Sequence, residues 1–371
     1  MIRLTLSFLL LAVISVGTFA ADSESVDLRY RSYRNWTVQL PTEQWFPVND
    51  GIQIGEYGDD FFFAVAMDGN QLKFDTDGDS KLDRTIKPLV DPKTNVSTTR
   101  VILSGKKNSG EVFKYAARLR RDAKGWEWAP GGAMAGTVNS PAGPVPIRII
   151  DQNGNGKFDD WGSDAMIVGN SDFATLLSKT IYVGGELRSV SFGKSKNSIV
   201  LAKYDGPTAT IDMKSNFESK AVLLSSIIAS NDNQHSFDVG AIEGSVKVPA
   251  GKYRIVSGTV GLGQQRATID AGKMKSIDLP AGKQRELNWG GPIRSEFRFA
   301  RAGGQIEFSP DQIWFYGKAG EQYAGWTPVG KSPEFKILNA DTGAVIELMM
   351  PPNQLTATLS VDDLRGANHK N

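Results

Sequence analysis

Apolar and polar residues alternate in short segments along most of this chain. Segments such as Arg100–Ser104, Val145–Ile150 and Lys273–Leu279 follow the period of two that is typical of half-buried β-strands. The chain also contains 39 glycines, 17 prolines and frequent Asp/Asn clusters, which favour turns between such segments. The pattern predicts a mainly β fold of two or three antiparallel β-sandwich domains with very little helix.

Two segments allow a helical interpretation. Ser171–Ser178 has the composition of two helical turns with Ser171 as the N-cap residue. Lys220–Ala229 is apolar enough to be either a buried strand or a short helix, and its periodicity does not decide between them. Long amphipathic helices are not predicted anywhere in the chain.

A polar cluster at Asn231–Gln234 lies between apolar segments and predicts a domain boundary. It divides an N-terminal region, 21–230, which has room for two subdomains, from a C-terminal region, 231–371, that ends in a short polar tail. In the second region, Pro249-Ala250-Gly251 and Pro280-Ala281-Gly282 each adjoin a predicted strand. These hairpins are similar to those of small sandwich modules in surface proteins and carboxypeptidase-type regulatory domains. The resemblance implies an immunoglobulin-like or transthyretin-like C-terminal domain.

The first 20 residues have the features of a secretory signal peptide. Arg3 is followed by an apolar run, Leu4–Val16, and then by small residues at Thr18 and Ala20. We expect cleavage after Ala20 and a secreted or periplasmic protein. The alternative, a retained membrane anchor, is less favoured because the run is shorter than the ~20 residues that span a bilayer. After removal of the signal peptide no transmembrane segment is expected.

Charge and cysteine content narrow the classes of partner. The formal net charge is +1 and the chain has no cysteine, so neither a disulfide nor a lipid-bearing cysteine is available. Such a balance argues against a nucleic-acid partner, which requires a basic face. Bound ions are another way to fix loops in an exported protein.

Two Asp/Asn-rich loops repeat one spacing of oxygen donors. The first loop offers the side chains of Asp75, Asp77, Asp79 and Asp83 and the backbone carbonyl of Lys81. The second loop offers the side chains of Asp151, Asn153, Asn155 and Asp159 and the backbone carbonyl of Lys157. Alternate oxygens converge when the chain curls around an ion, and Ca²⁺ accepts such all-oxygen, flexible sets. Zinc or copper would favour His or Cys instead.

The two loops resemble the D-x-[DN]-x-[DN]-G-x-x-D loops of thrombospondin type-3 repeats and, more distantly, those of EF-hands and dockerins. They lack the acidic residue at position 12, where Ile86 and Gly162 stand. The missing ligand is therefore expected from position 9, from water, or from Asp160 or Asp164, with a modest affinity of ~10⁻⁴–10⁻³ M. The apolar residues at position 8, Leu82 and Phe158, are expected to point into the core. The alternative is a pair of ordinary Asp/Gly-rich hairpin turns.

Signatures of catalysis are weak. His235 and His369 are the two histidines, and neither lies in a recognisable catalytic motif. Asp341-Thr342-Gly343 resembles the aspartic-protease motif but occurs once, so a hairpin turn is favoured. Gly261-Leu262-Gly263 is better explained by a hairpin than by a dinucleotide-binding loop. No catalytic residue is assigned, and a calcium-assisted carbohydrate-active enzyme or hydrolase on a β scaffold remains the alternative function.

Trp126 and Trp128 alternate along one predicted strand beside a Gly-rich loop, so they share a face. Exposed, they would stack on sugar rings or on a partner surface; the alternative is that both belong to the core. Taken together, the sequence favours a secreted or periplasmic calcium-binding β-sandwich protein. Its expected role is structural or binding, with polysaccharides or cell-surface molecules as candidate partners.

Overall fold

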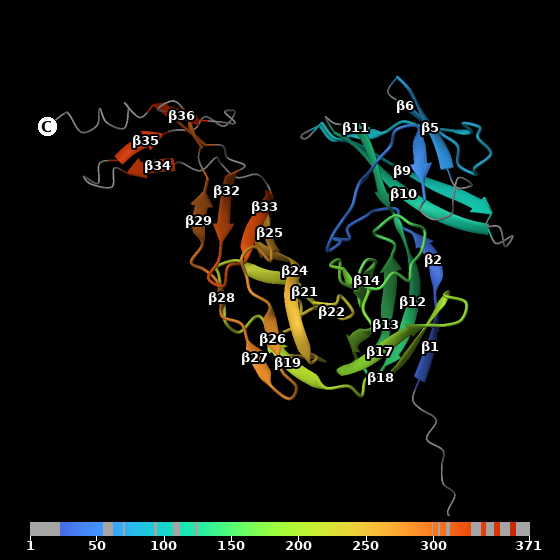
Figure 1. Cartoon of the computed structure of the whole chain (residues 1–371). Helices are drawn as coiled ribbons and strands as arrows, with labels where there is room; N and C mark the ends of the chain where they lie inside the picture. Colours follow the sequence, from blue (N-terminus) through green and yellow to red (C-terminus); the bar gives the residue numbers. More distant parts are fainter. Residues whose placement is uncertain are drawn as a thin grey trace, which may run out of the picture.

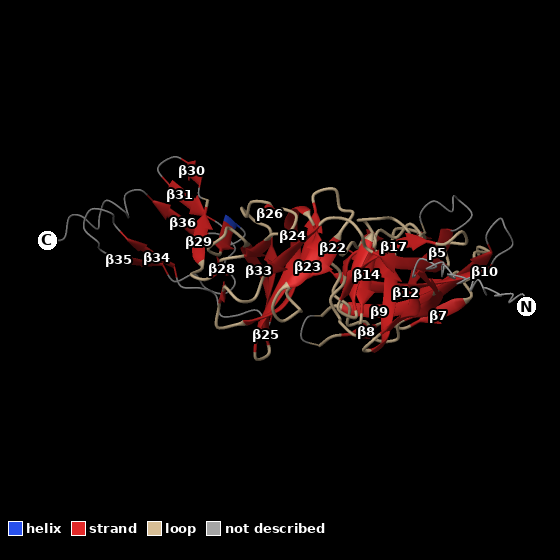
Figure 2. Ribbon diagram, turned by 90° about the horizontal axis from the view of Figure 1, so that it is seen from below, coloured by secondary structure: helices blue, strands red, loops and turns tan. Residues whose placement is uncertain are grey.

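The computed structural model describes residues 23–54, 62–69, 71–92, 95–106, 112–122, 125–298, 300–302, 305–308, 312–327, 335–338, 345–348 and 357–360. Within these ranges the chain forms strands, turns and loops, with one short 3₁₀ segment at Gln312 and no α-helix (Figure 2). The predicted mainly β fold with antiparallel sheets is confirmed. No helix in the described ranges is long and apolar enough to cross a membrane.

The first sandwich consists of two antiparallel sheets. One has the order β3-β11-β10-β9-β8: β3 (Phe46–Pro47), β11 (Gly125–Pro130), β10 (Val112–Asp122), β9 (Ser97–Lys106) and β8 (Leu89–Val90). The other has the order β4-β5-β6-β7: β4 (Gly51–Gln53), β5 (Phe62–Asp68), β6 (Gln71–Phe74) and β7 (Arg84–Ile86). Alternate side chains such as Phe63 and Phe74 from one sheet and Leu103 from the other form a shared core.

The second sandwich is built in the same way. One sheet has the order β15-β14-β13-β12-β2: β15 (Thr175–Leu176), β14 (Ala165–Val168), β13 (Gly143–Ile150), β12 (Gly132–Ser140) and β2 (Arg29–Ser32). The other has the order β1-β18-β17-β16: β1 (Ser23–Asp27), β18 (Ser198–Lys203), β17 (Glu186–Phe192) and β16 (Thr180–Val183). Ile147, Ile149 and Ile199 are buried between the sheets.

The third sandwich contains the largest sheet. Its strands are β22 (Ser236–Asp238), β21 (Val222–Ser230), β24 (Gly251–Leu262), β25 (Gln265–Asp270), β33 (Gln322–Thr327), β32 (Ile313–Tyr316) and β29 (Arg294–Phe297), with β26 (Ile277–Leu279) paired to β24. Two small sheets complete it: β23 (Val246–Pro249), β19 (Thr208–Asp212) and β27 (Gln284–Glu286); and β20 (Phe217–Glu218) with β28 (Trp289–Gly290). The β19–β27 and β20–β28 pairs are parallel. Trp289 and Tyr253 are fully buried in its core.

Beyond this core, five short strands form two further small sheets. They are β30 (Ala300–Ala302), β31 (Gln305–Phe308) and β36 (Ala357–Ser360), and β34 (Phe335–Leu338) with β35 (Val345–Leu348). An immunoglobulin-like or transthyretin-like form of the C-terminal region is not confirmed by these pairings.

The first sandwich is inserted between β2 and β12 of the second, and the third sandwich follows the second along the chain (Figure 1). The first and second are joined where β11 leads directly into β12, and the Gly131 amide donates to the Ala116 carbonyl there at 2.7 Å. The second and third are joined by side-chain bonds: the Leu176 amide donates to the Ser236 hydroxyl at 3.2 Å, and the Ser236 amide donates to the Ser178 hydroxyl at 3.0 Å. Buried polar contacts of this kind connect adjacent sandwiches.

The helix expected at Ser171–Ser178 does not form. The segment contains β15 and an isolated bridge between Phe173 and Gln39, and the Ser171 hydroxyl accepts the Phe173 amide at 2.9 Å in a local turn. A serine that bonds the backbone two residues ahead stabilises a turn as readily as it caps a helix. Lys220–Ala229 proves to be strand, as β21.

The polar cluster Asn231–Gln234, expected to separate two domains, forms a turn inside the third sandwich instead. The strands on either side of it, β21 and β22, pair with each other. Strand pairing changes partners earlier, between the end of β18 at Lys203 and the start of β19 at Thr208. A polar cluster indicates a turn, but the residues alone do not say whether the turn joins domains or strands of one sheet.

Candidate metal centres

The first loop, 75–83, connects the antiparallel strands β6 and β7. Asp75 is buried at the end of β6, whereas Asp77 and Asp79 are exposed. One carboxylate oxygen from each of the three lies within 4.8 Å of the others. Among the described residues, this is the group of three acidic, His or Cys side chains that could hold a metal ion.

Backbone amides hold the three carboxylates in place. Asp75 accepts hydrogen bonds from the amides of Asp77 at 3.2 Å, Gly78 at 2.8 Å and Ser80 at 2.9 Å. Asp77 accepts the Asp79 amide at 3.3 Å, and Asp79 accepts the Lys81 amide at 2.8 Å. Each carboxylate thus bonds an amide two residues ahead, which turns alternate side chains toward one side of the loop.

The tight curl requires left-handed backbone at two positions. Gly78 has φ 81° and Ser80 has φ 67°. Glycine takes this conformation without steric cost. Ser80 is held in it by the hydrogen bond that its backbone amide donates to the buried Asp75 carboxylate.

Two residues of the first predicted ligand set have other roles in the structure. The Asp83 carboxylate accepts the Thr76 amide at 3.0 Å and the Thr76 hydroxyl at 2.8 Å, so it ties the two ends of the loop together. The Lys81 ammonium donates to Asp79 at 2.7 Å, and this bond lowers the pKa of the Asp79 carboxyl. Asp83 therefore stands outside the group of three, and the Lys81 carbonyl stays a predicted ligand.

The second loop, 151–164, connects β13 to β14 and repeats the hydrogen bonds from backbone amides to side-chain oxygens. The Asp151 carboxylate, fully buried, accepts the amides of Asn155 at 3.1 Å and Gly156 at 2.6 Å. The Asn153 side-chain oxygen accepts the Asn155 amide at 3.2 Å, and that of Asn155 accepts the Lys157 amide at 2.8 Å. The side-chain oxygens of positions 1, 3 and 5 therefore each accept a backbone amide, as in the first loop.

Asp160 and Asp164 complete this arrangement. Asp160 accepts hydrogen bonds from the side-chain amides of Asn153 at 3.1 Å and Asn155 at 2.5 Å. The Asp160 amide donates to Asp164 Oδ2 at 3.0 Å, while Asp164 Oδ1 is buried without a hydrogen-bond partner. A buried carboxylate oxygen in this state is costly unless a cation binds it.

Burial raises the pKa values of the two buried acids. It raises the pKa of Asp151 to about 7. Burial, with the charge of Asp151 as the next contribution, raises the pKa of Asp164 to about 9. A divalent cation bound in this dry site would favour the ionised form of both carboxyls.

The predicted ligand Asp159 points elsewhere. Its carboxylate forms an ion pair with Lys196, in the turn between β17 and β18. The backbone amide of Lys157 donates to the side-chain oxygen of Asn155, and the Lys157 carbonyl stays a predicted ligand. The second loop therefore brings together Asp151, Asn153, Asn155, Asp160 and Asp164 but not the Asp159 carboxylate.

Long-range contacts of the second loop were missed by sequence reasoning. The Tyr115 hydroxyl, on β10 of the first sandwich, donates to Asp151 Oδ2 at 2.8 Å. Phe158 packs against the cores of both the first and the second sandwich, as expected of an inward position 8. The equivalent Leu82 is 41% exposed, so the same expectation was wrong for the first loop. The sequence gives no sign that Tyr115 contacts Asp151, because 36 positions separate them and only the fold brings them together.

Trp126 and Trp128 belong to the core of the first sandwich. They are 8% and 3% exposed, and the Trp128 ring packs 5.0 Å from Phe46 and 6.3 Å from Tyr115 between centroids. Neither ring offers a face for stacking on a ligand. The alternative that both tryptophans belong to the core therefore describes them.

The remaining candidate motifs carry no catalytic arrangement in the described residues. His235 Nδ1 lies 3.0 Å from the Thr180 hydroxyl, and burial lowers the pKa of this imidazole. Gly261–Gly263 is the end of β24 and the turn into β25, as the hairpin interpretation predicts. Asp341-Thr342-Gly343 and His369 lie outside the described residues.

No protein-family model, curated protein or solved structure matches this chain. The chemistry of the two loops is therefore argued from their own geometry.

Proposed function

We propose that this is a secreted or periplasmic β-sandwich protein in which calcium ions rigidify the loops 75–83 and 151–164. Its role is structural or binding rather than catalytic. The observation that carries the proposal is a hydrogen-bond pattern that the two loops share. In each loop a buried carboxylate, Asp75 or Asp151, accepts backbone amides of the residues that follow it. An ordinary hairpin turn does not require a fully buried carboxylate at its first position.

The donor set of the first cluster favours calcium, because three carboxylates without His or Cys form the flexible all-oxygen site that calcium accepts. The Asp75, Asp77 and Asp79 oxygens, within 4.8 Å of one another, lie inside the span of a calcium coordination shell, at most about 5 Å. Both oxygens of Asp75 and of Asp79 accept hydrogen bonds, so the ion would share these oxygens and displace the Lys81 ammonium from Asp79.

The position of the second loop supports a structural role. Its Asp151 is bonded to Tyr115 of the first sandwich, and its Phe158 packs against both cores. An ion that stiffened this loop would also fix the first two sandwiches relative to each other. Exported proteins meet millimolar calcium, so a modest affinity is sufficient for such a role.

Differential scanning calorimetry of the purified chain with calcium and with a chelator tests the proposal. At a calcium concentration 100 times the dissociation constant, each site should contribute about 2.7 kcal/mol to the free energy of unfolding. The double variant Asp75→Asn/Asp77→Asn should lose part of this gain. Asp68→Asn, which alters an exposed ion pair with Lys73 in the same sheet, should retain it. An unchanged melting temperature, with no calcium in the purified protein, would refute the ion sites.

Export is tested separately. Cell fractionation of the source organism should find the protein outside the cytoplasm, with a mature N-terminus at Ala21 when analysed by mass spectrometry. An intact Met1 in a cytoplasmic fraction would contradict the localisation but not the calcium sites.

A further inference from the structure

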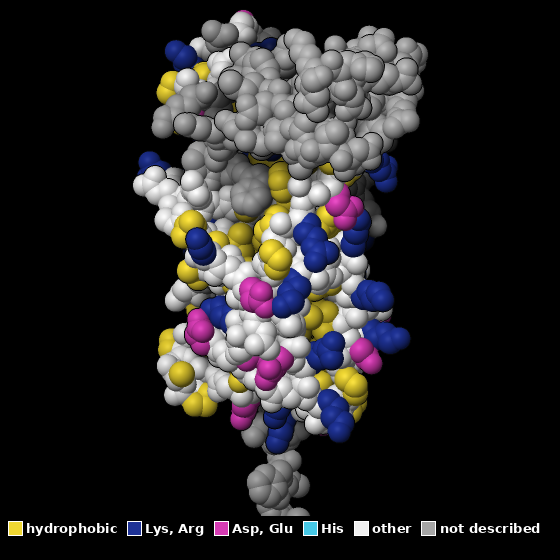
Figure 3. Space-filling view, turned by 90° about the vertical axis from the view of Figure 1, so that its left-hand side faces the viewer, with side chains coloured by type: hydrophobic (Ala, Val, Ile, Leu, Met, Phe, Trp, Pro, Cys, Tyr) yellow, Lys and Arg dark blue, Asp and Glu magenta, His cyan; other side chains and the backbone are white. Residues whose placement is uncertain are grey.

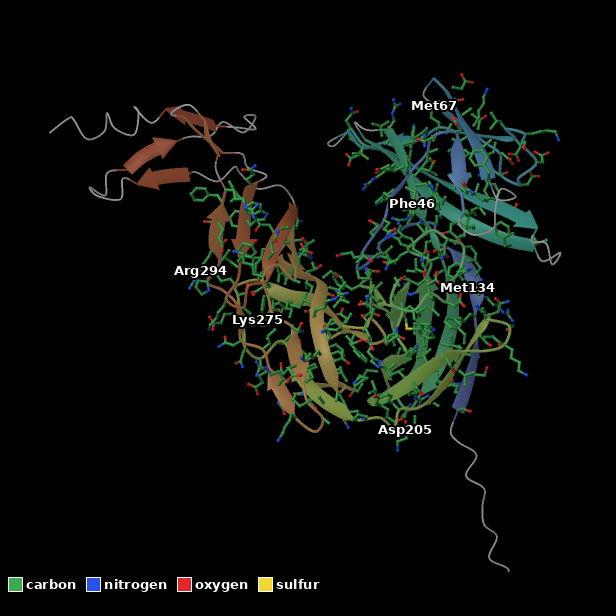
Figure 4. The ribbon with its side chains drawn as sticks, in the orientation of Figure 1. Phe46, Met67, Met134, Asp205, Lys275 and Arg294 are labelled. Atoms are coloured by element: carbon green, nitrogen blue, oxygen red, sulfur yellow. The ribbon has the colours of Figure 1, made fainter. Side chains whose placement is uncertain are left out.

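A groove of about 510 Å³ lies beside the second loop. It is bordered by β2 and β10, by loop residues Gly156–Asp159 and by the turn between β17 and β18. Met134 of β12 also lines it, and Figure 4 labels this residue near the junction of the first two sandwiches. Its volume falls within the 300–1,000 Å³ that is usual for small-molecule sites.

The rim of the groove carries excess positive charge. Of the described residues that line it, four are basic and one is acidic: Arg29, Lys114, Lys157, Lys196 and Asp159. Lys196 forms an ion pair with Asp159, so the rim retains a positive surplus. The whole chain has a net charge of only +1, which makes this surplus a local feature. On the face of the molecule in Figure 3, by contrast, basic and acidic side chains are interspersed.

The floor of the groove is aromatic and held rigidly. The Tyr30 ring is stacked on Tyr115 with centroids 6.4 Å apart and meets the edge of Phe158 at 6.0 Å. The Tyr30 hydroxyl accepts the Ala116 amide at 2.7 Å. A Cβ at Gly132 would lie 2.0 Å from this hydroxyl, so the glycine makes room for the ring. Tyr30 and Phe158 are half-buried and line the groove.

We propose that this groove binds an acidic oligosaccharide, in which sugar rings stack on Tyr30 and carboxylate or sulfate groups pair with the basic rim. Aromatic faces and cationic donors together match the two chemical features of such a ligand. The groove accommodates a few sugar units and not the long phosphate backbone of a nucleic acid. This inference rests on the proposed binding role and assigns it a ligand class.

Calcium in the second loop would assist binding. The loop contributes Gly156–Asp159 to the groove wall, so an ion that stiffens the loop would also fix this wall. A bound divalent ion also adds positive charge near an anionic ligand.

Isothermal titration calorimetry of the calcium-loaded, full-length protein tests the groove. Trigalacturonate and a sulfated heparin tetrasaccharide distinguish the two sources of negative charge, and maltotriose is the neutral control. At least one acidic probe should bind, more weakly as salt rises, whereas maltotriose should not. Binding of neither acidic probe would overturn the proposal. Equal binding of a short oligothymidylate or of hexaglutamate would overturn its saccharide assignment.

Variants locate the site. Arg29→Gln/Lys114→Gln should weaken binding at least about tenfold, because each charge-assisted hydrogen bond contributes on that order. Both side chains are exposed on strands and lie outside the predicted metal ligands. Lys275→Gln/Arg294→Gln, on the third sandwich (Figure 4), removes the same charge elsewhere and should leave affinity unchanged. Equal affinity in both double variants would overturn the assignment to this groove.

Two further measurements separate the possible failures. The charge-preserving variant Arg29→Lys/Lys114→Arg should keep most of the affinity, which shows that a loss in the Gln variant is not a folding defect. The calcium-dependent shift in melting temperature is recorded on the same wild-type sample. A shift without saccharide binding overturns the groove alone, and binding without a shift overturns the calcium sites alone.

Discussion

The substitution Asp164→Asn should change protein stability with opposite signs in the absence and presence of calcium. Asp164 is fully buried, and its Oδ1 atom has no hydrogen-bond partner. In a chelator at neutral pH, burial keeps Asp164 protonated in the folded chain, whereas the unfolded chain releases that proton. The neutral amide removes this protonation cost and should raise the free energy of unfolding by about 1–3 kcal/mol.

With calcium the result should reverse. Wild-type protein gains about 2.7 kcal/mol at a calcium concentration 100 times the dissociation constant. The variant has lost a charged ligand of the second loop and forgoes much of this gain. Its advantage in chelator should therefore shrink or become a deficit, because the carboxylate that destabilises the empty loop is the one that binds the ion.

Urea denaturation, followed by tryptophan fluorescence, measures the change in the free energy of unfolding. It is recorded in chelator and in 10-fold steps of calcium concentration, so that the sign of the change is obtained under both conditions. Asp159→Asn is the matched control, because Asp159 has the same side chain in the same loop but forms a peripheral ion pair with Lys196. Its effect should stay below about 1 kcal/mol in both conditions. Equal destabilisation of Asp164→Asn with and without calcium would refute the reasoning.

Three further predictions concern buried side chains outside the loops. Tyr115→Phe removes the 2.8 Å bond to Asp151 and should cost about 1–3 kcal/mol in urea denaturation, since a buried carboxylate loses a donor; an unchanged midpoint would argue against this link. Trp128→Ala, at a site 3% exposed, should cost about 3–5 kcal/mol and leave acidic-saccharide affinity in calorimetry unchanged. Burial raises the pKa of the Glu321 carboxyl, so the folded protein holds a proton that the unfolded chain releases. Stability of the third sandwich should therefore fall as pH rises from the ordinary glutamate range through the folded pKa, and Glu321→Gln should abolish that slope in pH-dependent urea denaturation.

Local patterns along the sequence were enough to predict the class of fold. Alternation in segments such as Val145–Ile150 marks strands because successive side chains of a strand point to opposite faces. Composition and the serine N-cap were misleading at Ser171–Ser178, where a turn and a two-residue strand replace the helical alternative. Short polar segments are ambiguous because a serine can bond its local backbone in a turn or in a helix cap.

The spacing of oxygen donors likewise marked both loops but did not show which of their side chains lie together. The positions of Asp75, Asp77 and Asp79 follow from the local curl, which backbone amides within the loop impose. Asp83 and Asp159, which have equivalent places in the two sequences, took different partners, Thr76 and Lys196. The partner of each depends on which segment the fold places beside it.

The sequence by itself determined what is set within a few residues: strands, turns and the oxygen-rich loops. Tertiary structure decided which strands share a sheet, and it placed Asn231–Gln234 inside a sandwich rather than between domains. It also buried Trp128, brought Tyr115 to Asp151 and gathered Arg29, Lys114 and Lys196 around one groove. These contacts join residues far apart in the chain, and their energies arise only when packing removes water from between them.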